Sequence, residues 1–192
     1  MKPPSLSVYI LAGGKSSRMG TDKGLVMLGE RPMIDHILTP MNTLSDRVII
    51  VSNNPQYEAF GVRLIPDTLE DLGPAGGILS ALQDSETDLN LLVSCDMPGI
   101  NGAAANFLIQ HSPDFQIILP EYQGRIEPLF GIYKKECVRV WEEKVLSGDH
   151  KLRLLIQHFR TKTVNVDHHP LFQAPFFTNV NTPEDLENFQ SF

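Results

Sequence analysis

Short, mainly apolar stretches alternate with amphipathic ones along the first two thirds of the chain. The apolar stretches are rich in β-branched residues, which predicts buried strands. They cover residues 7–13, 47–52, 62–67, 89–96 and 115–121. Residues 31–44 and 74–83 instead place apolar side chains three or four positions apart behind an early proline, which predicts helices. Strands of this kind with helices between them are typical of a parallel sheet that is covered on both faces.

The pattern is less regular after residue 121. Residues 127–135 alternate in a way that predicts a mixed strand, and helical and short strand patterns follow. The expected helices cover 136–146, 150–159 and 182–190, and the expected short strands cover 162–168 and 176–180. We therefore expect one α/β domain over residues 1–192, with three α/β/α layers and a mainly parallel sheet.

Three segments with candidate chemistry follow predicted strands directly. They begin at Gly13, Asp67 and Asp96. In open α/β sheets, ligands bind beyond the carboxyl ends of the strands. The sequence therefore predicts that these three segments contribute to a single site.

The first of these segments, LAGGKSSRMGTDK over 11–23, contains a Gly-Lys-Ser triplet. A P-loop requires another glycine five residues before the one in this triplet. That position is Tyr9, inside the predicted strand, so the segment is not a P-loop. The dinucleotide pattern G-x-G-x-x-G fails as well, because the first two glycines are adjacent. Adjacent glycines after a strand still let backbone N–H groups approach an anion, and Arg18 and Lys23 add positive charge for phosphates.

Charge and composition narrow the range of partners. The 192 residues include 16 basic and 23 acidic side chains, for a net charge of −7. This balance disfavours a broad nucleic-acid surface, although Lys15, Arg18 and Lys23 concentrate positive charge locally. The two cysteines lie far apart, which indicates a reducing compartment. No signal peptide or transmembrane stretch is recognisable, so we expect a cytoplasmic protein with no nucleic-acid or membrane partner.

The string L-A-G-G-x-S-x-R-M-G-x-D-K resembles the signature of the molybdenum cofactor guanylyltransferases, within the nucleotidyltransferase superfamily. Further segments resemble motifs of this family in the same order along nearly the whole chain. They are LGERPMIDHIL (28–38), IPDTLEDLGPAGGILSAL (65–82), LLVSCDMPGI (91–100) and FFTNVNTPEDL (176–186). The resemblance implies a Rossmann-like domain with a nucleotide-binding half (about 1–100) and an acceptor-binding half (about 101–192).

The family transfers GMP from GTP to molybdopterin-bound molybdenum cofactor, which forms the guanine dinucleotide cofactor and releases pyrophosphate. By this resemblance, Lys23, Arg18 and Asp96 are expected to be catalytic. The backbone of 11–13 is expected to hold guanine. The residues expected to bind the nucleotide or its cofactor are Leu11, Ala12, Gly13, Gly14, Lys23, Asn54, Asp67, Gly73, Gly77, Asp96, Asn179 and Asn181.

Several of these residues have a second interpretation. Asp96 is expected to bind Mg²⁺, because an exposed carboxylate at a strand end suits this hard cation, but it also suits the closing of a turn. Asp67 fits either a ribose or guanine contact or a helix or turn cap. Asn179 and Asn181 fit contacts with the metal or the attacking phosphate, and Asn181 fits equally well as the N-cap of the last helix.

Other functions stay open from the sequence. An enzyme of the same fold could use CTP, or a sugar phosphate as acceptor, and a catalytically inactive domain could only bind a nucleotide or a partner. Relatives that use CTP tend to carry L-A-A-G, so Gly13 favours GTP. The presence of Lys23 and Asp96 speaks against an inactive domain. Beyond GTP and the molybdopterin cofactor, the expected partners are transient ones, namely cofactor-biosynthesis proteins and molybdoenzyme chaperones.

Overall fold

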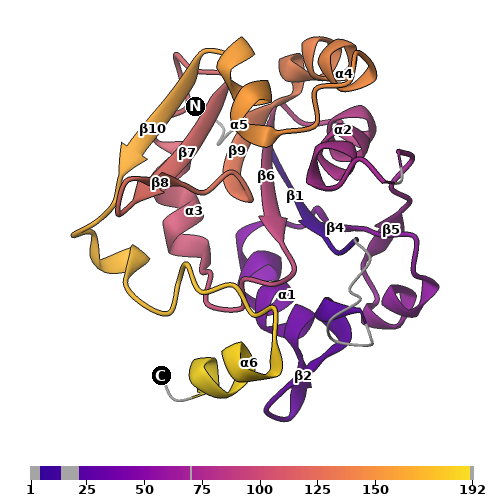
Figure 1. The fold of residues 1–192 in the computed structure, drawn as a ribbon, viewed down its shortest axis with the longest axis vertical. Helices are drawn as coiled ribbons and strands as arrows, with labels where there is room; N and C mark the ends of the chain where they lie inside the picture. The colour runs from indigo at the N-terminus through magenta and orange to yellow at the C-terminus, as the bar shows by residue number, and fades with distance from the viewer. Residues whose placement is uncertain (1–4, 14–21, 70, 191–192) are drawn as a thin grey trace.

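The computed structural model describes residues 5–13, 22–69 and 71–190, and its centre is an eight-stranded sheet (Figure 1). The strand order is β10-β7-β9-β6-β1-β4-β5, and β8 pairs with β7. The strands are β1 (Leu6–Leu11), β4 (Val48–Val51), β5 (Arg63–Ile65), β6 (Leu89–Ser94), β7 (Ile117–Tyr122), β8 (Arg125–Ile126), β9 (Phe130–Lys134) and β10 (Thr161–Asn165). All pairs are parallel except those of β9 with β6 and β7 and that of β8 with β7. The prediction of a mainly parallel sheet is confirmed.

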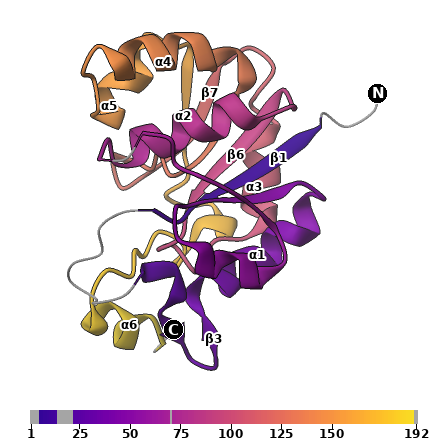
Figure 2. The ribbon, with the colours of Figure 1, turned by 90° about the vertical axis from the view of Figure 1, so that its right-hand side faces the viewer.

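Helices cover both faces of this sheet, as Figure 2 shows from the side. One face carries α1 (Met33–Leu44) and α3 (Gly102–Ile109), and the other carries α2 (Pro74–Asp84), α4 (Val138–Leu146) and α5 (Leu152–Leu155). The alternation of β1 explains both layers: Val8 and Ile10 join the core under α1 and α3, whereas Tyr9 and Leu11 join the core under α2 and α4. The predicted three-layer α/β/α arrangement is confirmed.

Three smaller elements lie at the lower end of the molecule in Figure 1. They are the antiparallel pair β2 (Met27–Leu28) and β3 (Arg31–Pro32), and the last helix α6 (Pro183–Gln190). The helix expected over 31–44 begins two residues later, at Met33, because Arg31 and Pro32 belong to the β2–β3 pair and the Met33 N–H donates to the Val26 carbonyl at 2.8 Å.

The helices and strands after residue 100 differ from the sequence-based expectations more than those before it. Residues 176–180 form no strand, because Phe176 packs into the core with Phe130 and Phe172 instead of pairing along the sheet. The helix expected over 150–159 is reduced to α5 and a 3₁₀ turn over Ile156–His158. The alternation did not predict α3, which begins where the Asn101 side chain accepts a hydrogen bond from the Ala104 N–H at 2.9 Å.

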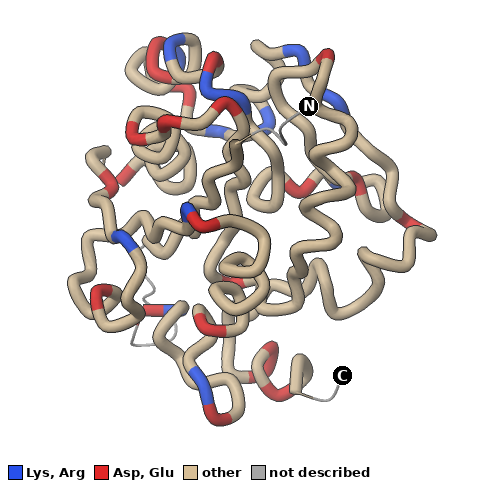
Figure 3. The backbone as a smooth tube through the Cα atoms, turned by 180° about the vertical axis from the view of Figure 1, so that it is seen from behind, with Lys and Arg blue, Asp and Glu red and all other residues tan. Residues whose placement is uncertain are grey.

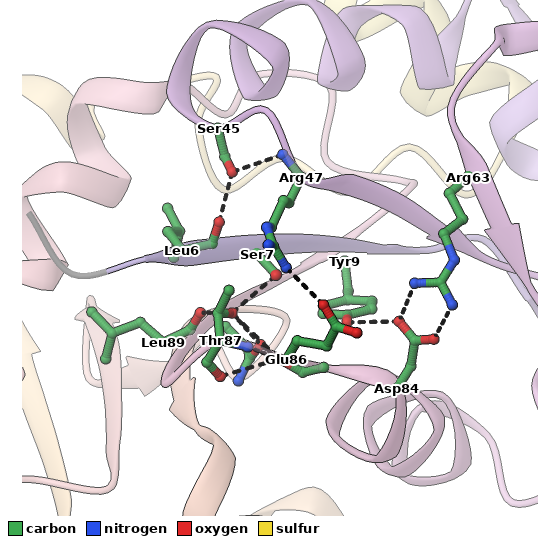
Figure 4. Close-up of polar contacts among 12 residues, drawn as sticks. Leu6, Ser7, Tyr9, Ser45, Arg47, Arg63, Asp84, Glu86, Thr87 and Leu89 are labelled. Carbon is green, nitrogen blue, oxygen red and sulfur yellow. Dashed lines mark hydrogen bonds and ion pairs between the residues drawn. The ribbon is translucent and has the colours of Figure 1, made fainter.

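Buried polar side chains close the amino ends of β1 and β6 (Figure 4). Thr87 donates from its hydroxyl to that of Ser7 at 2.9 Å, and the fully buried Asn90 donates to the Tyr133 carbonyl at 3.1 Å. These two hydrogen bonds give the buried polar side chains the partners that burial requires. Within the described residues, no helix has the length and apolar character that crossing a membrane requires.

Candidate active site

The carboxyl ends of β1, β4 and β6 meet at one edge of the sheet. Their last residues are in register, since Leu11 pairs with Val51 on one side and with Ser94 on the other. A cavity of about 630 Å³ lies at this edge, a size that is typical of small-molecule sites. Its lining residues are Leu11, Gly13, Asp22, Val51, Ser52, Asn53, Asn54, Asp67, Asp71, Gly73, Pro74, Gly77, Ser94, Asp96 and Leu129. The three segments that follow strands in the sequence therefore do come together.

Lys23, Asp96 and Asn181 converge beside this cavity although they are far apart in the sequence. The Lys23 Nζ lies 3.3 Å from Asp96 Oδ2 and also donates a hydrogen bond to Asn181 Oδ1. The second carboxylate oxygen of Asp96 accepts from the Ser94 hydroxyl at 2.6 Å. The side chains of Lys23 and Asp96 are 30% and 16% exposed, so the pair is partly shielded from water but accessible to a ligand.

The chain around Asn181 is held in place at both ends. The Val180 N–H donates to the Asp96 carbonyl at 2.8 Å, which ties this segment to the end of β6. The N–H groups of Asn181 and Thr182 both donate to one carboxylate oxygen of Asp185, and the Asp185 N–H donates back to the Thr182 hydroxyl. Thr182 is thus the cap of α6 in a capping box, and the N-cap interpretation of Asn181 is wrong. The Asn181 side chain faces Lys23 instead.

Asp67 and α2 form the opposite wall of the cavity. Asp67 Oδ1 accepts from the Leu69 N–H at 3.2 Å and from the Ser80 hydroxyl at 3.4 Å. The side chain of Asn53 binds the backbone of Asp67 in both directions, at 3.0 and 2.9 Å. Gly73 precedes α2 with a φ of 58°, a conformation that favours glycine. The expected helix start at Pro74 is confirmed, and the Asp67 carboxylate binds this helix further along, at Ser80.

Asn54 lines the cavity but binds other protein groups. Its Oδ1 accepts from the Gln56 N–H at 3.0 Å, which caps the 3₁₀ turn over Pro55–Phe60, and its Nδ2 donates to Asp22 Oδ2 at 3.3 Å. Asn54 therefore connects the turn after β4 to the residue before Lys23.

Of the other expected site residues, some line the cavity and some do not. Leu11 and Gly13 line the cavity, whereas Ala12 is fully buried and its N–H donates to the Val51 carbonyl at 3.0 Å. Asn179 is exposed and is not part of the cavity lining. Gly14 and Arg18 lie outside the described residues.

A family model that describes the MobA-like NTP transferase domain matches residues 8–166. The chain belongs to this family. It is 33% identical over 185 residues to a probable molybdenum cofactor guanylyltransferase of Carboxydothermus hydrogenoformans. The matched residues make up 95% of this chain and 94% of that relative. It is 34% identical over 194 residues to a molybdenum cofactor guanylyltransferase of Vibrio parahaemolyticus. Here the match spans 98% of this chain and 97% of the relative.

The fold agrees with that of a solved structure. The crystal structure of molybdopterin-guanine dinucleotide biosynthesis protein A from Archaeoglobus fulgidus superposes with a TM-score of 0.82 at 23% identity, over 96% of this chain and 97% of that one. By its family match and its curated relatives, this MobA-like protein is a nucleotidyltransferase, and the family resemblance that the signature predicted is confirmed.

The oxygen donors of this nucleotidyltransferase suit a divalent cation that also binds phosphate. In the described part of the chain, no three His, Cys, Asp or Glu side chains cluster as a complete metal cage. Mg²⁺ does not require one, because it is usually bound by one or two carboxylates together with waters and substrate phosphates. Asp96 Oδ2 faces the Lys23 ammonium, whereas Asp96 Oδ1 accepts from the neutral Ser94 hydroxyl and keeps a lone pair for such a cation. The donor set therefore fits.

Two acidic residues, one lining the cavity and one bound to its lining, were not expected from the sequence. Asp22 lines the cavity, and its position directly before Lys23 in the signature was the available signal. Glu127 follows β8, and its Oε1 accepts from the N–H of the cavity residue Leu129 at 2.9 Å. Burial raises the pKa of Glu127 above its usual value, and the negative charge of Asp96 adds to this effect. No sequence pattern indicated Glu127, because its environment depends on the fold of β8 and β9.

Proposed function

We propose that this protein transfers GMP from GTP to molybdopterin-bound molybdenum cofactor and releases pyrophosphate. In this reaction an oxygen of the acceptor bonds to the α-phosphorus while the bond between that phosphorus and pyrophosphate breaks. The observation that supports it most directly is the convergence of Lys23, Asp96 and Asn181 beside a nucleotide-sized cavity at the carboxyl edge of the sheet. The names and near full-length coverage of the relatives support the choice of GTP and of the acceptor.

Each side of the cavity has a part in this proposal. Gly13 lines it, and a Cβ built there meets no atom of the described residues within 4 Å, which leaves room for the base to lie against the backbone. Asp67 and the start of α2 at Gly73 and Gly77 form the wall for ribose and guanine. Lys23, together with Arg18, neutralises the charge that grows on pyrophosphate as it leaves. The protein thus acts by positioning groups and stabilising charge, as phosphoryl transfer requires.

Asp96 would hold Mg²⁺ through its Oδ1, since its Oδ2 and the Asn181 side chain bind the Lys23 ammonium. The ion supplies Lewis-acid stabilisation of the phosphate oxygens when it is bound. Asn179 would contact the acceptor. In this proposal, residues from about 101 to 192 form the acceptor-binding half and residues from about 1 to 100 form the nucleotide-binding half.

We further propose that the protein is cytoplasmic and that it makes transient contacts with cofactor-biosynthesis proteins and molybdoenzyme chaperones. We expect it to bind no nucleic acid. The net charge of −7 supports this, and in Figure 3 the basic positions of the described chain are interspersed with acidic ones. The alternatives are use of CTP, a sugar phosphate acceptor, and an inactive nucleotide-binding domain.

The test is pyrophosphate release with each of the four NTPs and Mg²⁺, with and without molybdopterin cofactor. We expect release only with GTP and cofactor together. Lys23→Ala is the matched control and should lose most of the turnover while its melting temperature stays nearly unchanged, because a partly exposed lysine contributes little to stability. Equal or faster turnover with CTP would replace the guanine assignment by the cytidine one. Tight GTP binding without any turnover would support the inactive domain.

Gly13→Ala adds a specificity arm to the same assay. Its new methyl group would project into the cavity, because no other atom of the described residues lies within 4 Å of it. We expect the preference for GTP over CTP to fall in this variant. An unchanged preference would show that residue 13 does not read the base.

A further inference from the structure

Asp22, the residue before Lys23, is bound by three groups from two segments of the chain. Its Oδ1 accepts hydrogen bonds from the Tyr57 hydroxyl and, at 3.4 Å, from the Gly24 N–H. Its Oδ2 accepts from Asn54 Nδ2 at 3.3 Å. Two of these donors, Asn54 and Tyr57, belong to the segment after β4, so the Asp22 carboxylate joins that segment to the 3₁₀ turn over Lys23–Leu25.

The Tyr57 side chain is a rigid partner for this carboxylate. It is fully buried, at 0% exposure, in the core under α1. Burial raises the pKa of its hydroxyl above the ordinary value, with smaller contributions from Cys95 and from the hydrogen bond to Asp22. The hydroxyl is therefore protonated at neutral pH and donates to Asp22.

Gly24 leaves the space that this contact needs. A Cβ at residue 24 would lie 2.5 Å from the Tyr57 hydroxyl and 3.2 Å from its ring. Real Cβ atoms do not approach other atoms so closely, so the buried Tyr57 side chain would have to shift. Glycine at this position and tyrosine at residue 57 are thus fitted to each other.

We propose that Tyr57, acting through Asp22, is a positioning residue that holds the Lys23 ammonium at Asp96 and Asn181. The inference rests on the proposed function. Lys23 follows Asp22 directly and begins the turn that Asp22 caps, so fixing the Asp22 carboxylate fixes the backbone from which the Lys23 side chain extends. A long lysine side chain has considerable rotamer freedom, and an anchored backbone limits how far its ammonium strays from the position that catalysis needs.

The test compares Tyr57→Phe with Tyr9→Phe. Tyr9 is also buried and also donates its hydroxyl to an aspartate, Asp84 Oδ2, at 2.8 Å, but that pair lies outside the cavity lining (Figure 4). Both variants should lose a similar, small amount of thermal stability. We expect Tyr57→Phe to lower kcat about tenfold or more with little change in the Kd for GTP, and Tyr9→Phe to keep the wild-type kcat.

Gly24→Ala gives a second, coupled measurement. Alone it should impair turnover, because its methyl group displaces the Tyr57 hydroxyl from Asp22. In the Tyr57→Phe background it should cost much less, since the contact is already lost and the closest clash is removed. Full additivity of the two losses, or a Tyr57→Phe enzyme as active as Tyr9→Phe, would overturn the proposal.

A readout that needs no turnover separates this inference from the proposed function. NMR of the Lys23 side chain reports whether its ammonium is held at Asp96 and Asn181. The Lys23 signal should move toward that of an unrestrained lysine in Tyr57→Phe and stay in place in Tyr9→Phe. If the wild type showed no GTP-dependent activity, the proposed reaction would be refuted, yet this shift would still support the positioning role. An unchanged Lys23 signal in Tyr57→Phe would refute the positioning role whatever the reaction.

Discussion

At the scale of single residues, two aspartates in closely similar settings occupy different ends of the sheet. Asp96 and Asp84 are 16% and 15% exposed, each lies beside a cationic side chain, and each accepts from a hydroxyl. Asp84 binds Arg63 and Tyr9 (Figure 4), whereas Asp96 binds Lys23 and Ser94 at the cavity. Their similar exposure and partners allow a structural carboxylate to be compared with the proposed metal ligand.

We expect Asp96→Asn to fold normally and to lower turnover about 100-fold or more, because the Mg²⁺ that would offset the developing negative charge loses its anionic ligand. Its affinity for Mg²⁺·GTP should fall, and raised Mg²⁺ should restore part of it. Asp84→Asn should do the reverse, losing about 1 kcal/mol of stability with turnover intact. Steady-state kinetics and urea unfolding measure both. An active Asp96→Asn variant at ordinary Mg²⁺ would move the proposed metal site to other residues, with Asp67 as the next candidate.

The sequence predicted those site residues that a motif places at the end of a strand. Lys23 and Asp96 were expected from the signature and from the Cys-Asp-Met-Pro turn, and the fold brings them to 3.3 Å from each other. Tyr57 was not expected, because its importance comes from a contact with Asp22 across 35 positions of the chain. Periodicity and local spacing carry no information about such a contact.

At the scale of elements, the sequence predicted the buried strands better than the short helices. β1 and β6 read as mainly apolar runs because both of their faces are covered. Helix α3 was missed because its eight residues are apolar nearly all round, so no amphipathic period marks it. Residues 176–180 read as a strand because their apolar residues serve a core contact of an irregular segment, which a periodicity argument cannot distinguish from pairing.

The start of α2 allows a stability prediction from two adjacent glycines. A Cβ on Gly76 would lie 2.6 Å from the Leu69 carbonyl oxygen, whereas a Cβ on Gly77 would make an ordinary contact of 3.4 Å with Leu11. Gly76→Ala should therefore destabilise the protein by about 1–3 kcal/mol, as overpacking does. Gly77→Ala should stay within about 1 kcal/mol of wild type, because alanine also favours the helix.

Urea unfolding of the two glycine variants checks this expectation. The matched design removes the common effect of replacing a glycine in a helix, so the difference reports the contact with the Leu69 carbonyl. Equal stabilities of Gly76→Ala and Gly77→Ala would show that the segment before α2 shifts to accept the methyl group. The close approach of α2 to the Asp67 segment would then not be a requirement of the fold.

At the scale of the whole molecule, one sheet carries both proposed halves of the active site. β6 lies between β1, which leads to the cavity wall of Gly13, and β9, which begins after Leu129. Asp96 follows β6 and so stands where the two halves meet. This placement suits a reaction that joins two substrates, because each can approach the shared charge from its own side.

Two substitutions, one on each side, test this division. Asp67→Asn removes a charge from the proposed nucleotide wall but keeps an oxygen for the Leu69 N–H and the Ser80 hydroxyl. It should raise the Kd for GTP several-fold and leave the KM for the cofactor acceptor unchanged. Asn179→Ala removes an exposed side chain from the proposed acceptor side and should raise that KM without changing the Kd for GTP. Titration calorimetry and initial rates measure the two constants. If both variants changed the same constant, the two substrates would not approach from opposite sides of β6, and the division of the chain near residue 100 would fail.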